Sequence, residues 1–171
     1  MNIKDYIVLA IMLAAIAAWS PTASAADIIG IYAGVSTGKA EILETTPVED
    51  DTATKIYAGY KAFGPLGIEI AQIDLGEHYS NALSINSTAV DLVAFLPLPL
   101  IDLFAKVGVH SWDVDYVSPL LTDQSGTDST YGFGLNFSVF PFVALRLEYE
   151  RFKDIGNADM DLTSIGLNVS F

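Results

Sequence analysis

The sequence predicts an all-β protein, an eight-stranded antiparallel up-and-down transmembrane β-barrel. Three observations lead to this fold: apolar residues recur at every second position in eight segments, no window has a helical period, and only 17% of the residues are charged. Alternation with a period of two is typical of strands that have one apolar face. A length of 171 residues suits one domain rather than two.

The first 25 residues predict an export signal rather than a membrane anchor. Lys4 precedes an unbroken apolar run from Ile7 to Ala18, and Ala-Ser-Ala at 23–25 has the small-x-small pattern of a signal peptidase site. The run is too short for a membrane-spanning helix, which needs about 20 apolar residues. We therefore expect a signal peptide over residues 1–25 and a barrel domain over residues 26–171.

The eight predicted strands cover residues 29–38, 55–62, 66–70, 90–96, 103–110, 131–139, 143–150 and 164–171. The first four have the apolar sets Ile29, Ile31, Ala33, Val35; Ile56, Ala58, Tyr60, Ala62; Leu66, Ile68, Ile70; and Val90, Leu92, Ala94, Leu96. The last four have Leu103, Ala105, Val107, Val109; Tyr131, Phe133, Leu135, Phe137, Val139; Val143, Leu145, Leu147, Tyr149; and Ile165, Leu167, Val169, Phe171. Each set forms one continuous face in a strand.

The predicted connections alternate in length. Those near residues 63–67, 97–102 and 140–141 are short, whereas those near 39–53, 77–87, 114–128 and 153–159 are longer and polar. This alternation is typical of outer-membrane barrels, whose short turns face the periplasm.

The apolar faces are expected to contact lipid. A soluble barrel of the lipocalin type would enclose them instead, but it would need many charged residues outside, and the charged fraction here is below the usual value of about 25%. The polar face consists largely of Gly, Ser, Asn and Thr, which suit a narrow interior. The bulky Tyr131, Phe133 and Phe137 lie on the other face.

Composition excludes several classes of partner and site. The net charge of -13 argues against a nucleic-acid partner. The absence of cysteine excludes a lipoprotein anchor, a disulfide framework and a thiolate metal site. We expect no cofactor, no metal site and a monomeric protein.

The closing segment, SIGLNVSF, predicts a strand that completes the barrel. In lipid every backbone donor and acceptor needs a partner, so the last strand must pair with the first. The segment also resembles the assembly signal of outer-membrane barrels, through Ser164, Gly166, Val169 and Phe171. This resemblance implies recognition by the barrel-assembly machinery.

Longer strings resemble the OmpA-like transmembrane-domain family of small eight-stranded barrels. They are LFAKVGVHSWDVDY at 103–116, YGFGLNFSVFPFVALRLEYERF at 131–152, and the closing strand. The resemblance implies an outer-membrane location among lipids and lipopolysaccharide. Many members continue into a peptidoglycan-binding domain, whereas this sequence ends at the barrel, so we expect no such tether to the cell wall.

Several charged residues share the predicted inward face: Lys55, Lys61, Glu69, Asp91, Lys106, His110, Arg146, Glu148 and Glu150. A charge in a narrow barrel must be paired, because burying an isolated charge costs several kcal/mol. Opposite signs on the third, fifth and seventh strands predict a network of Glu69, Lys106, Arg146 and Glu148. It would form either a closed plug of ion pairs or a gated pore or proton path, and the family resemblance implies a plug that can rearrange.

One string suggests an enzyme. HYSNA, at residues 78–82, is identical to a motif of lipid A 3-O-deacylases, which are also eight-stranded barrels. The resemblance implies that His78 is the base and Ser80 the nucleophile, with the acid left open between Glu77 and Asp91. In those enzymes the motif lies near the end of the chain, and such residues are also common in turns.

Aromatic and acidic residues give weaker signals. The expected interfacial girdles include Tyr32, Tyr60, Tyr79, Trp112, Tyr116, Tyr131 and Tyr149. Trp112 is also a candidate for sugar binding. The predicted loops carry Glu41, Glu44, Glu49, Asp50, Asp51, Asp113, Asp115, Asp123 and Asp128. These form either a solvated acidic surface or sites for divalent cations shared with lipopolysaccharide.

The sequence therefore predicts a non-enzymatic barrel of the bacterial cell outer membrane that supports membrane integrity. Its long acidic loops would be available for adhesion or for a surface ligand of unknown identity. The alternatives are a small gated pore and a lipid A deacylase that uses His78 and Ser80.

Overall fold

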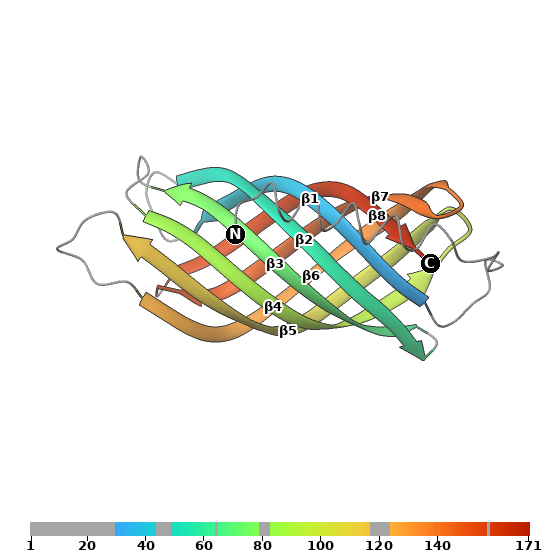
Figure 1. Ribbon diagram of the computed structural model, residues 1–171, viewed down its shortest axis with the longest axis horizontal. Helices are drawn as coiled ribbons and strands as arrows, with labels where there is room; N and C mark the ends of the chain where they lie inside the picture. Colours follow the sequence, from blue (N-terminus) through green and yellow to red (C-terminus); the bar gives the residue numbers. More distant parts are fainter. Residues whose placement is uncertain (1–29, 44–48, 64, 79–82, 117–123, 157) are drawn as a thin grey trace.

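A computed structural model of the chain describes residues 30–43, 49–63, 65–78, 83–116, 124–156 and 158–171. The expected signal peptide lies outside these residues. Eight strands form a closed barrel in which each strand is hydrogen-bonded to its neighbours in sequence (Figure 1). The predicted fold class is confirmed. No helix in the described ranges has the length and apolar character needed to cross a bilayer.

The strands are long for a membrane barrel. They are β1 (Gly30–Ile42), β2 (Glu49–Phe63), β3 (Leu66–His78), β4 (Leu83–Pro97), β5 (Ile101–Tyr116), β6 (Gln124–Phe140), β7 (Val143–Ile155) and β8 (Ala158–Ser170). Their lengths run from 13 to 17 residues, whereas a tilted strand crosses a bilayer with about 9–11. Part of each strand therefore extends beyond the hydrocarbon layer.

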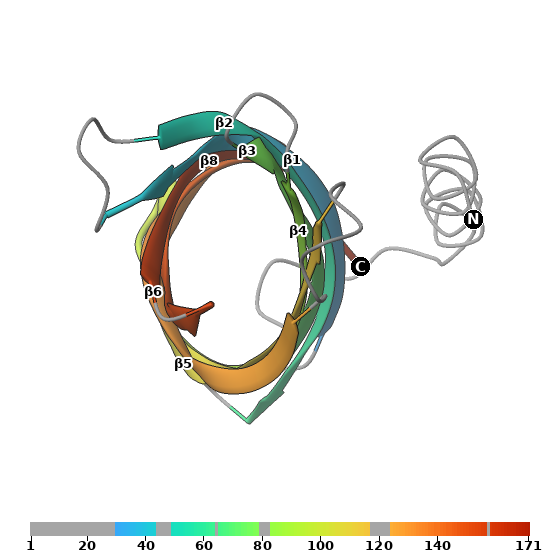
Figure 2. The same ribbon diagram turned by 90° about the vertical axis from the view of Figure 1, so that its left-hand side faces the viewer.

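The barrel is closed by β1 and β8. The two strands pair antiparallel from Tyr32 opposite Ser170 to Ile42 opposite Met160. The backbone N–H of Phe171 then donates to the carbonyl of Ile31 at 2.9 Å. The end-on view in Figure 2 shows the resulting ring of strands. Closure pairs the edges of β1 and β8, as a sheet in lipid requires.

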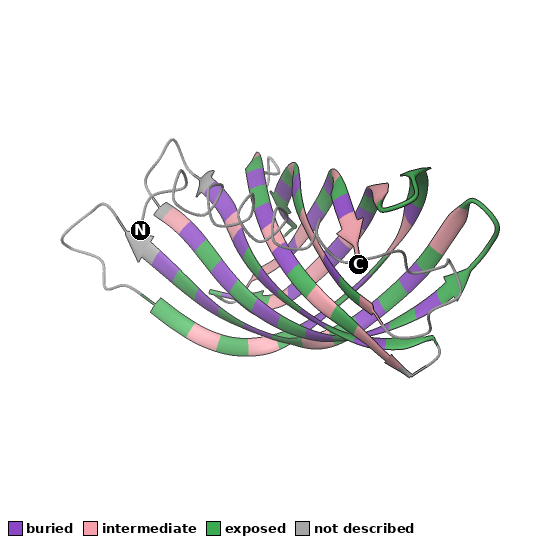
Figure 3. Ribbon diagram, turned by 45° about the vertical axis from the view of Figure 1, so that its right-hand side comes forward, coloured by how far each residue is buried: buried purple, intermediate pink, exposed green. Residues whose placement is uncertain are grey.

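Burial alternates along the middle part of the strands, as Figure 3 shows. Large apolar side chains are exposed on the outer wall, including Ile68 at 55%, Val107 at 58% and Phe133 at 61% of full exposure. The inward neighbours of these residues are buried or half-buried. The expected lipid-facing side of the strands is therefore the outer wall of the barrel.

The connections expected to be long are shorter than the sequence suggested. β1 continues to Ile42 and β2 begins at Glu49, inside the connection predicted over residues 39–53. The one predicted over 153–159 is a tight turn between β7 and β8, with positive φ at Asp154 (54°) and Gly156 (58°). Several acidic residues assigned to loops, including Asp113 and Asp128, therefore lie in strands.

The strands extend into the expected loops because the polarity of the two faces of the wall is reversed toward one end of the barrel. Toward the long-connection end, outward residues become polar, as with Thr54, Thr88 and Ser111. A dozen buried apolar residues fill the interior there: Ala40, Ile42, Ala53, Ile73, Leu75, Ile85, Trp112, Val114, Phe152, Ile155, Met160 and Leu162. We call this group the apolar plug. Beyond the bilayer the outside is water, so the barrel follows the burial rule of soluble proteins.

The interior also holds aromatic residues that sequence periodicity did not assign to it. Tyr32 and Trp112, expected in the interfacial girdles, are buried at 2% and 7% exposure. Glycines make room for such rings: a Cβ on Gly59 would lie 2.1 Å from the ring of Tyr32. Tyr60 and Tyr131 do face outward. Tyr79 and the side chain of Tyr116 lie outside the described residues.

Candidate functional site

A buried cluster of charged side chains crosses the middle of the lumen. It contains three cations and four carboxylates, which are Lys55, Lys106, Arg146, Glu69, Asp91, Glu148 and Glu150. β2, β3, β4, β5 and β7 supply these residues, always at inward positions of the alternation. We call it the lumen network.

Lys106 lies at the centre of the lumen network. Its Nζ is 2.8 Å from Glu148 Oε1, 3.2 Å from Glu69 Oε1 and 3.4 Å from Asp91 Oδ2. It also pairs with Glu150. A single ammonium group thus holds carboxylates from three different strands.

Arg146 links the network to aromatic residues. Its guanidinium group pairs with Glu69 (Nη1 to Oε2, 2.9 Å) and with Glu148 (Nη2 to Oε1, 2.9 Å). The same group lies 4.3 Å from the centre of the Tyr57 ring and 4.1 Å from that of Phe104. Ring faces favour a planar cation, so Arg146 is held both by charge and by stacking.

The structure brings together all four residues predicted to form a network, and adds others. Lys55 pairs with Glu148, and the Tyr32 hydroxyl donates to Glu69 Oε2 at 3.0 Å. The inward alternation had placed Lys55 in the lumen, but nothing in the sequence indicated that Tyr32 would reach Glu69. Three cations against four carboxylates leave the network one negative charge in excess.

Apolar and aromatic layers lie on both sides of the lumen network. On β5 the inward residues run in the order Phe104, Lys106, Gly108, His110, Trp112 and Val114 from the short-turn end. His110 packs edge-on against Phe152 of the apolar plug, with ring centres 5.2 Å apart. Its Nδ1 lies 3.1 Å from Ser87 Oγ. The lumen network is thus enclosed at both ends: by aromatic residues toward the short turns and by the apolar plug toward the long connections.

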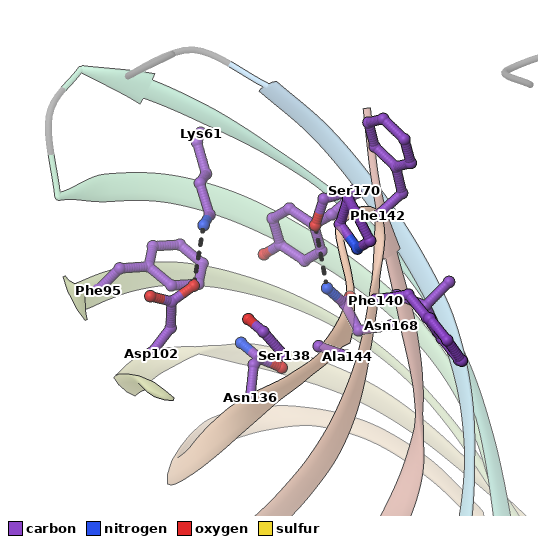
Figure 4. Close-up of a pocket in the computed structure, with 13 residues that line it drawn as sticks. Lys61, Phe95, Asp102, Asn136, Ser138, Phe140, Phe142, Ala144, Asn168 and Ser170 are labelled. Carbon is purple, nitrogen blue, oxygen red and sulfur yellow. Dashed lines mark hydrogen bonds and ion pairs between the residues drawn. The ribbon is translucent and has the colours of Figure 1, made fainter. Parts of the chain in front are cut away.

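A small cavity opens at the short-turn end of the lumen, as Figure 4 shows. Its volume is about 170 Å³, and Lys61, Asp102, Asn136 and Asn168 are among its lining residues. Lys61 Nζ is 3.8 Å from Asp102 Oδ2 and 4.3 Å from the centre of the Phe95 ring. Lys61, which shares the inward face of β2 with Lys55, thus lies at the mouth of the barrel.

Of the residues in the enzyme hypothesis, only the strand position of His78 and the surroundings of Asp91 can be compared among the described residues. Ser80 and the side chain of His78 lie outside the described residues. The strand register places His78 opposite Leu83, eight positions along β4 from Asp91, a distance of roughly 26 Å at 3.3 Å per residue. Asp91 pairs with Lys106 instead. It is therefore too far away to orient His78.

Trp112 is also not available to a surface sugar. It is buried in the apolar plug, and its indole Nε1–H donates to Asp128 Oδ2 at 3.0 Å. Within the described ranges, no three His, Cys, Asp or Glu side chains converge on a position for a metal ion.

Comparison with known proteins places this geometry in a family. The family model of the OmpA-like transmembrane domain matches residues 25–170, which include every described strand. The chain belongs to this family. Two curated members, each named outer membrane protein A, are 25% identical to it over 139 residues in Klebsiella aerogenes and 167 residues in Salmonella typhi. The matches cover 72% and 82% of this chain but only 40% and 48% of those proteins, so this OmpA-like chain spans less than half of their length.

Solved structures show the same OmpA-like fold. Neisserial surface protein A (NspA) matches with a TM-score of 0.63 at 17% identity, covering 82% of this chain and 97% of that one. The barrel domain of Pseudomonas aeruginosa OprF has a TM-score of 0.65 at 12% identity, covering 83% and 99%. Ail, the attachment invasion locus protein of Yersinia pestis, has 0.57 at 18% identity, also covering 83% and 99%.

The four residues of the predicted assembly signal lie on both faces of the closing seam of this OmpA-like barrel. Ser164 is buried, and Gly166 faces β1 so closely that a Cβ would lie 2.2 Å from the carbonyl oxygen of Val35. Val169 pairs with Ala33 of β1, and Phe171 bonds to Ile31 through its backbone. Recognition of these residues by the assembly machinery stays a prediction.

The exposed apolar side chains of the outer wall, such as Ile68, Val107 and Phe133, form a band that we call the apolar belt. Outside the lumen, two ion pairs join β7 and β8 beyond this belt. Arg151 Nε lies 2.6 Å from Asp161 Oδ1, and Lys153 pairs with Asp159. The hydrogen bond from Lys153 holds the pKa of the Asp159 carboxyl below its usual value. These pairs are partly exposed to water, which screens them, in contrast to the buried pairs of the lumen network.

Proposed function

We propose that this outer-membrane barrel is a non-enzymatic structural protein that supports membrane integrity and does not conduct ions at rest. The observation that carries this proposal is the filled lumen, in which the lumen network lies beneath the apolar plug. An ion would have to break buried ion pairs and then cross a dry apolar layer. Both steps are unfavourable, since apolar constrictions close pores by excluding water.

Planar-bilayer recordings test the closed lumen. We expect no single-channel steps from the wild-type barrel. A Phe152→Ser, Leu162→Ser double variant removes plug volume and admits water above the network, so it shows whether the network alone also blocks ions. Regular conductance steps from the wild type would instead support the gated pore.

The structural role is tested in cells. Deletion of the gene should raise sensitivity to large antibiotics and detergents, and expression of the wild-type barrel should restore resistance. A variant with the lumen network intact and residues 44–48 replaced by a Gly-Ser linker of equal length should restore it equally. Unchanged sensitivity after deletion would contradict a role in membrane integrity.

A surface-contact role is a second candidate, favoured by the resemblance to Ail, a protein of attachment and invasion. Ail has been solved in complex with sucrose octasulfate, a heparin analogue. The net charge of -13 argues against such a polyanion here, so we expect a neutral or cationic ligand. Replacing residues 44–48 with a Gly-Ser linker of equal length keeps the connection between the paired ends of β1 and β2, and reduced binding of cells to host surfaces would support this role.

The deacylase hypothesis rests on the HYSNA string and has its own test. Mass spectrometry of lipid A from cells that express the wild type should show no loss of an acyl chain. Loss that disappears in Ser80→Ala would establish the enzyme and overturn the non-enzymatic proposal.

A further inference from the structure

The cavity at the short-turn mouth has the features of a binding site. It is separated from the lumen network by the ring of Phe95, which packs edge-on against Tyr32 with ring centres 5.8 Å apart. Charged side chains are accessible in this cavity: those of Lys61 and Asp102 are 28% and 31% exposed. Its ligand would therefore enter from outside the barrel.

Two buried amide groups in the cavity have unused hydrogen-bonding capacity. Asn136 and Asn168 are each only 5% exposed, and both line the cavity (Figure 4). The side-chain carbonyl oxygens of both have no hydrogen-bond partner among the described residues. An acceptor that stays unpaired when buried costs stability. The two oxygens thus lack the partner that a donor bound in this cavity would supply.

Two charged side chains at the mouth, Asp102 and Lys61, add ionic contacts to the two amide oxygens. Asp102 adds a carboxylate to the two amide oxygens, and together they suit an ammonium group, which has three donors. Lys61 adds a cation beside them, at 3.8 Å from Asp102. This is longer than a hydrogen bond, so both groups retain capacity for a ligand that carries the complementary charges.

The surroundings place the mouth near lipid headgroups. The two neighbouring turns expose large apolar side chains, with Leu98 at 47%, Leu100 at 65%, Phe140 at 67% and Phe142 at 52%. In an outer-membrane barrel, exposed apolar and aromatic side chains at the strand ends suit the membrane interface. Phe140 and Phe142 also line the cavity, which therefore opens where the headgroups of the adjacent leaflet lie.

We propose that this mouth cavity binds a small zwitterion that carries a primary ammonium group and an oxyanion, such as a phosphoethanolamine headgroup. The ammonium group lies against Asp102, Asn136 and Asn168, and the oxyanion against Lys61. The volume of about 170 Å³ is below the roughly 300–1,000 Å³ of pockets for drug-sized ligands, so the site fits a headgroup or an amino acid. A lipid and a soluble zwitterion share this chemistry.

Titration of the folded barrel in an uncharged maltoside detergent tests the site. The probe is free ethanolamine phosphate, and the readout is the NMR signals of the Asn136 and Asn168 side-chain amides. We expect saturable shifts, with affinity reduced about tenfold or more in Lys61→Gln and in Asp102→Asn, because each loses one charged contact. Asp113→Asn is the matched control: it removes a carboxylate from the outer wall of the same strand, β5, and should bind as the wild type does.

Two further arms define the ligand. Ethanolamine alone and inorganic phosphate alone each carry one of the charges, and both should bind about tenfold more weakly than the zwitterion. Nanodiscs with phosphatidylethanolamine, compared with phosphatidylglycerol, should reproduce the shifts if the headgroup of a lipid fills the site. Shifts from the free probe only would assign the site to a soluble zwitterion.

The proposal is overturned if neither free ethanolamine phosphate nor phosphatidylethanolamine shifts the NMR signals of the two amides. It is also overturned if the shifts persist unchanged in both Lys61→Gln and Asp102→Asn. If ethanolamine alone bound as tightly as ethanolamine phosphate, the ligand would not need an oxyanion, and the assignment to a zwitterion would be wrong. Lys61 and Asp102 are partly exposed, so their substitution should leave the barrel folded, and heat-modifiable mobility on gels checks this. Channel recordings are independent of the outcome, since the cavity lies outside the layers that close the lumen.

Discussion

The guanidinium carbon of Arg146 lies 4.1 Å from the centre of the Phe104 ring, in the layer that separates the lumen network from the mouth. The opposite charges of Glu69 and Glu148 hold the same group at 2.9 Å. A lysine could supply the charge but not the flat face. Arg146 is therefore the residue through which the ion pairs and the aromatic layer support each other.

Replacing Arg146 with Met should strongly destabilise the barrel. The substitution leaves the buried carboxylates with two cations in place of three, and breaking a buried pair costs about 3–5 kcal/mol. Urea unfolding in lipid vesicles measures the loss. Arg151→Met is the control, since that arginine pairs on the partly solvated outer wall, where water reaches the remaining carboxylate, and it should cost less than Arg146→Met. Equal effects of the two substitutions would mean that the lumen network does not stabilise the fold.

Two arginine substitutions on β5 should locate the membrane boundary. Val107 and Ser111 both face outward, but only Val107 lies in the apolar belt. Val107→Arg should cost about 2–4 kcal/mol, whereas Ser111→Arg should cost about 0–1 kcal/mol. Unfolding free energies in vesicles give both values. A large cost at Ser111 would place that residue in hydrocarbon and contradict the exchange of faces along the wall.

That exchange of faces explains what the sequence predicted and what it did not. The eight strands and their lipid-facing sides follow from local alternation, because each outward residue between Leu103 and Val109 contacts the same solvent, lipid. Strand ends were misjudged because polar outward residues beyond the bilayer resemble a loop. Only the closed barrel shows that Trp112 and Phe152 are enclosed on the inner side of the same strand segments.

Contacts between distant strands were also beyond the reach of periodicity. The alternation placed Lys106 and Glu148 on the inward face, and their charges suggested a pair. The contact of Tyr32 with Glu69 depends on the curvature of the barrel, which brings inward side chains of β1 and β3 together over the intervening β2. The cavity at Asn136 and Asn168 likewise forms only when the barrel closes, because strands far apart in the sequence line it.

The apolar plug should contribute to stability although it lies beyond the bilayer. Phe152 is fully buried, and Phe152→Ala should cost about 3–5 kcal/mol through lost contacts and a residual cavity. Phe152→Leu keeps most of the volume and should cost less than about 1.5 kcal/mol. Hydrogen exchange should also accelerate in the outer ends of β7 and β8. A wild-type stability in Phe152→Ala would mean that the membrane-embedded half alone carries the fold.

The pairing of Gly59 with Tyr32 should show strong coupling. An alanine Cβ at position 59 would lie 2.1 Å from the Tyr32 ring, which is buried and hydrogen-bonded to Glu69. Gly59→Ala should therefore cost about 1–3 kcal/mol, as overpacking does. Tyr32→Leu removes the ring, so Gly59→Ala should cost much less in that background, and the two losses should not add. A double-mutant cycle of unfolding free energies measures this coupling, and strict additivity would show that the ring can move aside without cost.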